Sequence, residues 1–210
     1  MTAVTTPGVT LEELRFTNGF TQLPEVFYED RVPAGLSDAR LVAASPDAGA
    51  LIDLDPSQLG REELVRIASG NAILRAMRPI AAIYGGHQFG VWAGQLGDGR
   101  AIVLGEVTNR RGEPWEIQLK GAGQTAFSRF ADGRAVLRST IREFLASEAM
   151  DALGIPTTRA LAMVASAEPV VRETVETAAI CVRLAPSFVR FGSFELFAAR
   201  GPARSVRPRG

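Results

Sequence analysis

The pattern of apolar and polar positions changes near Ile83. Before this residue, short apolar stretches alternate with Pro and Gly, which predicts small helices. One opens at a capping box over residues 10–13, one has Pro46 in its first turn, and one covers residues 61–69. From Ile83 onward, apolar runs separated by glycine-containing turns predict strands. We therefore expect an N-terminal extension over residues 1–80, held against the surface, and then a β-rich unit over residues 81–197.

Within the β-rich unit, Asp98-Gly99 lies between apolar runs at 91–93 and 101–104 and predicts a hairpin turn. Residues 115–120 alternate strictly between apolar and polar, as a strand with two different faces does. The alternation places Trp115, Ile117 and Leu119 on one face and Glu116, Gln118 and Lys120 on the other.

The strongest helix is predicted over residues 133–153, with Asp132 as its N-cap and the Gly154-Ile155-Pro156 segment as its end. Two further strands are expected at 159–164 and 178–184. The apolar residues of this helix fall near one face, which consists of Leu137, Ile141, Phe144, Leu145 and Met150.

Composition narrows the possible functions without selecting one. Hydrophobic residues make up 46% and charged residues 22% of the chain, as in ordinary globular proteins, and the formal net charge is +0. We therefore expect no bulk attraction to nucleic acid or to a membrane, and with no signal-peptide pattern we expect a cytoplasmic protein. Single copies of cysteine, Cys181, and histidine, His87, exclude an internal disulfide and any site needing two imidazoles. The arginine- and proline-rich segment 198–210 is expected to be disordered.

Lys120 is the only lysine among the 23 basic residues. A coding bias towards arginine explains most of this skew, but it does not explain why one position kept lysine. A compact ammonium reaches a phosphate in a tight space where a planar guanidinium does not fit. Lys120 is therefore a candidate phosphate-binding residue.

A glycine-rich turn at 97–100, a strand that ends in Lys120 and a helix that carries Glu143 and Glu148 follow one another along the chain. Protein kinases use this order in their small lobe, where glycines admit phosphates to the backbone and a helix glutamate holds the strand lysine. Each feature alone has a plainer explanation, since Asp-Gly turns and surface glutamates are common. Their joint order predicts a kinase-like nucleotide site, with either glutamate as the partner of Lys120.

Several long consecutive motifs stand out, among them YGGHQFG at 84–90, QLGDGR at 95–100, QLKGAG at 118–123 and DGRAVLRSTIRE at 132–143. Through these motifs, the chain resembles the selenoprotein O family of protein adenylyltransferases over about residues 16–195. The resemblance implies a pseudokinase fold that holds ATP flipped relative to kinases and transfers AMP to Ser, Thr or Tyr hydroxyls of proteins, with Mg²⁺ or Mn²⁺.

The resemblance also implies roles for individual residues. Glu143 resembles the helix glutamate that pairs with the lysine, and no catalytic residue or metal ligand is assigned in this chain. The residues that resemble the family's nucleotide contacts are Gly97, Gly99, Arg100, Lys120, Asp132, Gly133, Arg183 and Arg190.

The family's metal ligands, an Asp-Asn pair and a later Asp, belong to a second lobe. Here no asparagine follows Asn109 and no aspartate follows Asp151. We therefore expect an α+β kinase-like small lobe, an antiparallel sheet with a long helix, that is truncated before the second lobe. One alternative is a nucleotide-binding remnant without turnover. Another is an interaction module that has lost ATP binding. Against it stand the retained residues Lys120, Asp132, Arg183 and Arg190.

Overall fold

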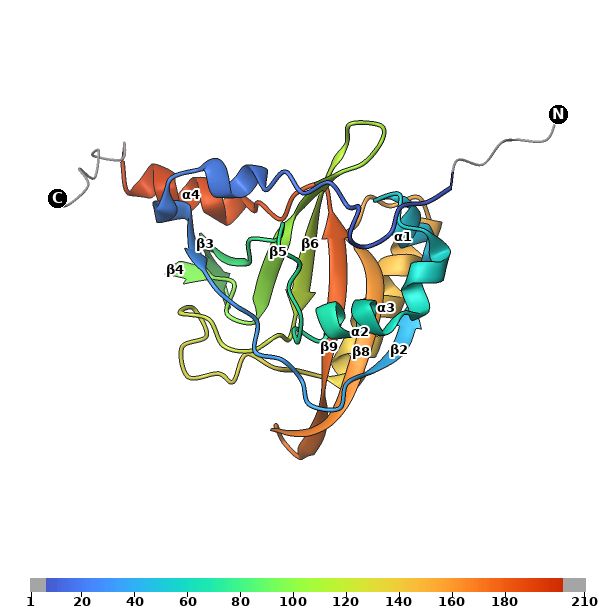
Figure 1. The fold of residues 1–210 in the computed structure, drawn as a ribbon. Helices are drawn as coiled ribbons and strands as arrows, with labels where there is room; N and C mark the ends of the chain where they lie inside the picture. Colours follow the sequence, from blue (N-terminus) through green and yellow to red (C-terminus); the bar gives the residue numbers. More distant parts are fainter. Residues whose placement is uncertain (1–6, 202–210) are drawn as a thin grey trace.

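The computed structural model describes residues 7–201, and its fold is α+β, as expected (Figure 1). The helices are α1 (Pro46–Ala50), α2 (Glu62–Ala68), α3 (Leu137–Ala152) and α4 (Phe191–Ala199), with the short 3-10 helices η1 (Gly19–Gln22), η2 (Glu25–Phe27) and η3 (Pro56–Gly60). The strands are β1 (Tyr28–Asp30), β2 (Arg40–Ala44), β3 (Ile80–Gln88), β4 (Val91–Gly97), β5 (Ala101–Thr108), β6 (Pro114–Lys120), β7 (Ala135–Val136), β8 (Arg159–Val171) and β9 (Val175–Ala185).

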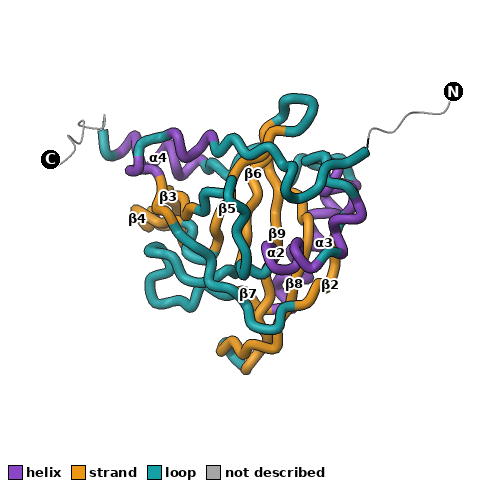
Figure 2. The backbone as a smooth tube through the Cα atoms, viewed as in Figure 1, coloured by secondary structure: helices purple, strands orange, loops and turns teal. Residues whose placement is uncertain are grey.

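The strands form one 9-stranded sheet in the order β1-β3-β5-β6-β9-β8-β2, with β4 paired to β3 and β7 paired to β9 (Figure 2). The paired strands are antiparallel. Helix α4 lies beside β3 at one end of the sheet, whereas α1, α2 and α3 lie near β8 and β2 at the other (Figure 1). The centre of the sheet is therefore formed by β5, β6 and β9, and β6 and β9 carry Lys120 and Arg183 of the predicted site.

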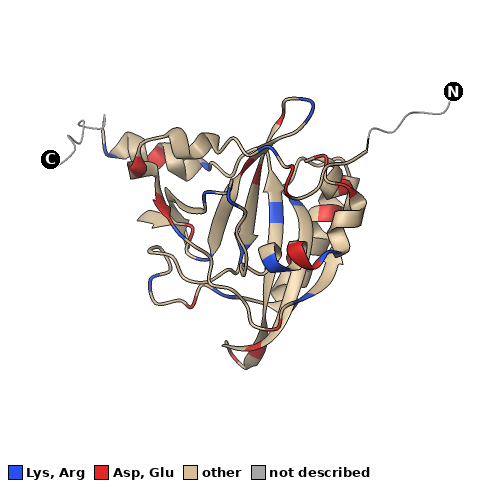
Figure 3. Cartoon of the chain, in the orientation of Figure 1, with Lys and Arg blue, Asp and Glu red and all other residues tan. Residues whose placement is uncertain are grey.

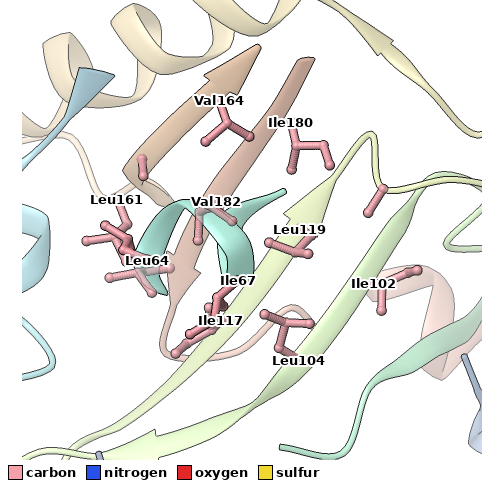
Figure 4. Close-up of a cluster of buried hydrophobic side chains, with 14 of the residues drawn as sticks. Leu64, Ile67, Ile102, Leu104, Ile117, Leu119, Leu161, Val164, Ile180 and Val182 are labelled. Atoms are coloured by element: carbon pink, nitrogen blue, oxygen red, sulfur yellow. The ribbon is translucent and has the colours of Figure 1, made fainter. Parts of the chain in front are cut away.

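The first 80 residues are more deeply integrated than a surface extension. Strand β1 pairs with β3 at one edge of the sheet, and β2 pairs with β8 at the other. Helix α2 packs Leu64 and Ile67 into the main hydrophobic core, against the apolar side chains of β6 and β9 (Figure 4). The predicted helices at Pro46 and at 61–69 are both present, as α1 and α2. The helix predicted from Thr10 was wrong: the Thr10 N–H donates to Glu13, but residues 11–13 form only a turn.

Strand β6 has the two faces that its alternation predicts, but both faces are covered. Ile117 and Leu119 belong to the main core under α2 (Figure 4). On the opposite face, Glu116 and Gln118 are also buried, and only Lys120 stays partly exposed. The polar face of β6 therefore points into the interior of the molecule and not into bulk water.

The Asp98-Gly99 segment does not form the predicted hairpin. Strand β4 pairs with β3 through a turn at Phe89 and Gly90, both of which have positive φ angles. Strand β5 pairs instead with β3 and β6. The prediction was wrong because the Asp98 side chain is buried and bonded within the structure, so this turn is part of the interior and not a hairpin tip.

The long helix begins later than predicted, and Asp132 is not its N-cap. Residues 135–136 form β7, which pairs with β9, and Val136 occupies the N-cap position without a side-chain hydrogen bond. Gly133 has a φ of 70°, and a Cβ there would lie 2.1 Å from the Gly123 carbonyl. Close packing of two backbone segments therefore holds the chain extended until Leu137, where α3 starts.

Three of the five residues on the predicted apolar face of α3 are exposed. Ile141, Leu145 and Met150 are 36%, 62% and 43% exposed, whereas Thr140 and Ser147 are buried. Small polar side chains let the helix approach β8 and β9 closely, with Thr140 satisfied by the Val136 carbonyl.

Two other expectations concern disorder at the C-terminal end of the described residues and the membrane. Ala198 and Ala199 belong to α4, which contradicts disorder at these two residues, and residues 202–210 lie outside the described part. No helix within residues 7–201 is long and apolar enough to cross a membrane.

Candidate functional site

A cavity of about 760 Å³ lies against the polar face of β6. It is bounded by β6, by the turn that follows β4, by the loop at 127–134 and by the residues around β9 and α4. The residues predicted to bind nucleotide all line this one cavity, and they are Gly97, Gly99, Arg100, Lys120, Asp132, Gly133, Arg183 and Arg190. Residues up to 93 positions apart, 190 minus 97, are thus brought together.

The Lys120 ammonium lies 2.7 Å from Glu143 Oε2 on α3. Glu143 Oε1 lies 3.0 Å from Arg183 Nε on β9, an ion pair without good hydrogen-bond geometry. One half-buried carboxylate therefore holds two cations at the cavity wall. The other candidate, Glu148, is occupied elsewhere, since it accepts hydrogen bonds from Arg159 and Ser45.

A second cluster fixes Arg190. Its guanidinium Nη2 lies 3.2 Å from Asp98 Oδ1, and its Cζ lies 4.3 Å from the centre of the Tyr84 ring. Asp98 is only 2% exposed and also accepts a hydrogen bond from the Ala82 N–H. Burial raises the pKa of Asp98, and the nearby Arg190 charge opposes this shift. Sequence reasoning missed Asp98, because the Asp-Gly pair gave only a turn signal.

The glycine turn packs directly against the loop that follows β6. A Cβ on Gly97 would lie 2.3 Å from the Phe127 ring, and one on Gly99 would lie 2.8 Å from the Phe127 carbonyl oxygen. The Thr125 hydroxyl donates to the Asp98 carbonyl at 2.7 Å. In this structure the glycines thus allow close packing of the loop, and the turn and loop together form one wall of the cavity.

Asp132 lies at the rim of the cavity, where Arg172 of the β8–β9 hairpin reaches it at 2.7 Å. Its Oδ1 also accepts the Arg134 N–H at 2.9 Å. The hydrogen bond from Arg172 lowers the pKa of Asp132, so this carboxylate stays ionised. Asp132 therefore connects the cavity loop to the tip of the hairpin.

The described residues do not supply a metal site by themselves. Among residues 7–201 there is no group of three or more His, Cys, Asp or Glu side chains that could hold a metal ion. The acidic groups lining the cavity, Asp98 and Asp132, are paired with arginines, and Glu143 is paired with Lys120 and Arg183. Burial raises the pKa of Cys181 to about 12, so its thiol stays protonated near neutral pH.

Comparisons with known proteins agree with the motifs. The family model described as protein adenylyltransferase SelO matches residues 10–207. Similar curated proteins carry the name protein nucleotidyltransferase YdiU. The one from Thiobacillus denitrificans is 61% identical over 198 residues, covering 94% of this chain and 41% of that protein. The one from Thioalkalivibrio sulfidiphilus is 59% identical over 195 residues, covering 92% and 40%. The chain thus spans about 40% of the length of these relatives, in line with the expected partial match.

Proposed function

The chain belongs to the SelO family of protein adenylyltransferases, and from this premise we propose that its cavity binds ATP. The chain then supplies the nucleotide-binding part of an enzyme that transfers AMP to Ser, Thr or Tyr hydroxyls of proteins. The observation that carries the proposal is the bridge made by Glu143, which orients Lys120 and Arg183 toward one cavity.

Electrostatics favours a polyphosphate in this cavity. Arg100, Lys120, Arg183 and Arg190 line it, whereas the two acidic residues of its lining, Asp98 and Asp132, are each paired with an arginine. Elsewhere on the chain, basic and acidic residues are interspersed (Figure 3). Charge-assisted hydrogen bonds from ammonium and guanidinium groups to phosphate are about twice as strong as neutral ones. Because Glu143 and Asp98 already orient three of these cations, little reorganisation is needed when a phosphate arrives.

The arrangement of elements supports the same ligand. An antiparallel sheet carries the lysine on a central strand, and the following helix α3 carries its glutamate partner. Protein kinases place ATP phosphates beside such a lysine–glutamate pair. We therefore interpret residues 81–197 as a kinase-like nucleotide-binding lobe, to which the first 80 residues add two edge strands.

A nucleotide-binding remnant without turnover is the second candidate. It is favoured by one observation, the lack of a carboxylate cluster for a metal among residues 7–201. Mg²⁺ sites for phosphoryl chemistry use carboxylate and other oxygen ligands. In this account the charge of the phosphates is met by Lys120 and the arginines alone, so binding is expected from the chain and turnover is not.

Transfer of label from ATP to a protein acceptor distinguishes the adenylyltransferase from the remnant without turnover. The 210-residue chain should bind ATP but transfer no label to a generic protein acceptor with Mg²⁺ or Mn²⁺ present. A chimera in which this chain replaces the matching segment of the Thiobacillus denitrificans relative should transfer label from α-³²P-ATP and not from γ-³²P-ATP. Transfer of the γ label would indicate a kinase and refute adenylyl transfer. A chimera that binds ATP yet transfers neither label would favour the remnant.

A further inference from the structure

Gln118 of β6 is fully buried, with 0% exposure, and it lines the cavity of about 760 Å³. Neither its Oε1 nor its Nε2 has a hydrogen-bond partner among the described residues. A buried amide without partners is destabilising, and such groups are rare in folded proteins. An apolar side chain of the same shape would avoid the free-energy cost of burying an amide without partners. A ligand that bonds to the amide would explain why glutamine stands at this position.

The other buried amide side chains among residues 7–201, Asn109 and Gln58, both have hydrogen-bond partners. The Asn109 side chain donates to the Leu51 carbonyl and to Glu113, and its oxygen accepts from the Arg111 N–H. Gln58 accepts a hydrogen bond from Arg61 at 2.8 Å. These two buried amides therefore have hydrogen-bond partners within the fold, whereas Gln118 has none.

The surroundings of Gln118 identify the kind of ligand. Arg183 stands directly opposite it on β9, and Lys120 follows two positions along β6 on the same face. Arg190 lines the same cavity. A site enclosed by cations takes an anion, and an amide N–H adds a donor to an anion without adding further charge.

We propose that Gln118 Nε2 donates a hydrogen bond to a phosphate oxygen of the bound nucleotide, between Lys120 and Arg183. This assignment rests on the proposed ATP site and adds one neutral donor to it. The amide oxygen then accepts from the guanidinium of Arg183, whose Nε lies 3.0 Å from Glu143 Oε1 without a hydrogen bond. Residues directly opposite on antiparallel strands have Cβ atoms about 5 Å apart, which is within reach for these two side chains.

The test uses Gln118→Met, which keeps the length of the side chain and removes both polar atoms. We expect the melting temperature without ligand to equal or exceed that of the wild type, because an unpartnered amide is removed. Affinity for ATP and for inorganic tripolyphosphate, measured by calorimetry, should each fall about tenfold, the value of one hydrogen bond to a charged group. The matched control is Gln58→Met, which should lower the melting temperature and leave both affinities unchanged.

The outcomes separate the inference from the proposed function. If the wild type binds neither probe, the ATP site and the role of Gln118 fall together. If it binds both and Gln118→Met binds them equally well, only the role of Gln118 is refuted. A lower melting temperature with unchanged affinity would show a structural amide, held by buried water, and would overturn the proposal. Weaker ATP binding with unchanged tripolyphosphate binding would place the amide on the nucleoside and refute the phosphate contact.

Discussion

Lys120→Met is expected to lower the affinity of the chain for ATP by about 100-fold, roughly 3 kcal/mol. The substitution removes the ammonium that would contact phosphate. It also leaves Glu143 with Arg183 as its one remaining ion-pair partner among residues 7–201, so the net negative charge near the phosphates rises. Methionine keeps the unbranched shape of the side chain, which limits any change in packing. Calorimetric titration with ATP measures the change.

The matched control is Arg111→Met, which removes one positive charge at the other end of β6. Arg111 also forms an ion pair of 2.7 Å, with Glu113, but that pair is exposed and outside the cavity. Its loss should change ATP affinity by less than about twofold, since exposed ion pairs contribute little. If Lys120→Met and the wild type bind ATP with equal affinity, Lys120 does not contact the nucleotide.

Stability should fall as the pH rises from about 4.5 to about 7, because of Glu116. Burial raises the pKa of this carboxyl from 4.5 to about 7, with Glu106 and Asp98 adding to the shift and Arg190 opposing it. In this pH window the folded protein keeps a proton that the unfolded chain releases. The stabilisation is therefore complete below about pH 4.5 and is lost through pH 7, a change on the order of 2–3 kcal/mol.

The measurement is the free energy of unfolding from denaturant titrations across this pH range, for the wild type and for Glu116→Gln. Glutamine still accepts the hydrogen bond that the Phe188 N–H donates to Glu116 at 2.5 Å, but it does not titrate. Asp98 has a pKa shifted in the same direction and is present in both proteins, so the difference between them isolates Glu116. Parallel curves for the two proteins would show that the pKa of Glu116 is the same in the folded and unfolded states, which would contradict the raised pKa.

Local patterns predicted the elements better than their connections. Periodicity depends only on neighbouring residues, so it predicted the alternation in β6. It also predicted the order of a turn, a strand with Lys120 and a helix with Glu143. The Asp98-Gly99 hairpin failed because pairing depends on distant residues. Asp98 is drawn inward by the Ala82 N–H and by Arg190, which lies 92 positions later, 190 minus 98.

Burial of the polar face of β6 could not be predicted from its pattern. Polar residues alternating with apolar ones normally face water, yet Glu116 and Gln118 are enclosed by the segments around Phe188 and β9. The apolar face expected on α3 likewise does not show which side of the helix is covered, since Thr140 and Ser147 are buried whereas Ile141 and Leu145 are exposed. In both cases, the elements that pack against the strand or helix decide which face is covered. The residue pattern of that strand or helix alone does not show which elements these are.

The most direct test of the nucleotide site is a crystal structure of the 210-residue chain with a non-hydrolysable ATP analogue. The account predicts the triphosphate in the cavity beside β6, within hydrogen-bond distance of Lys120, Arg183 and Arg190. A nucleotide bound elsewhere on the chain, or phosphates that leave the Lys120–Glu143 pair and both arginines without contact, would contradict it.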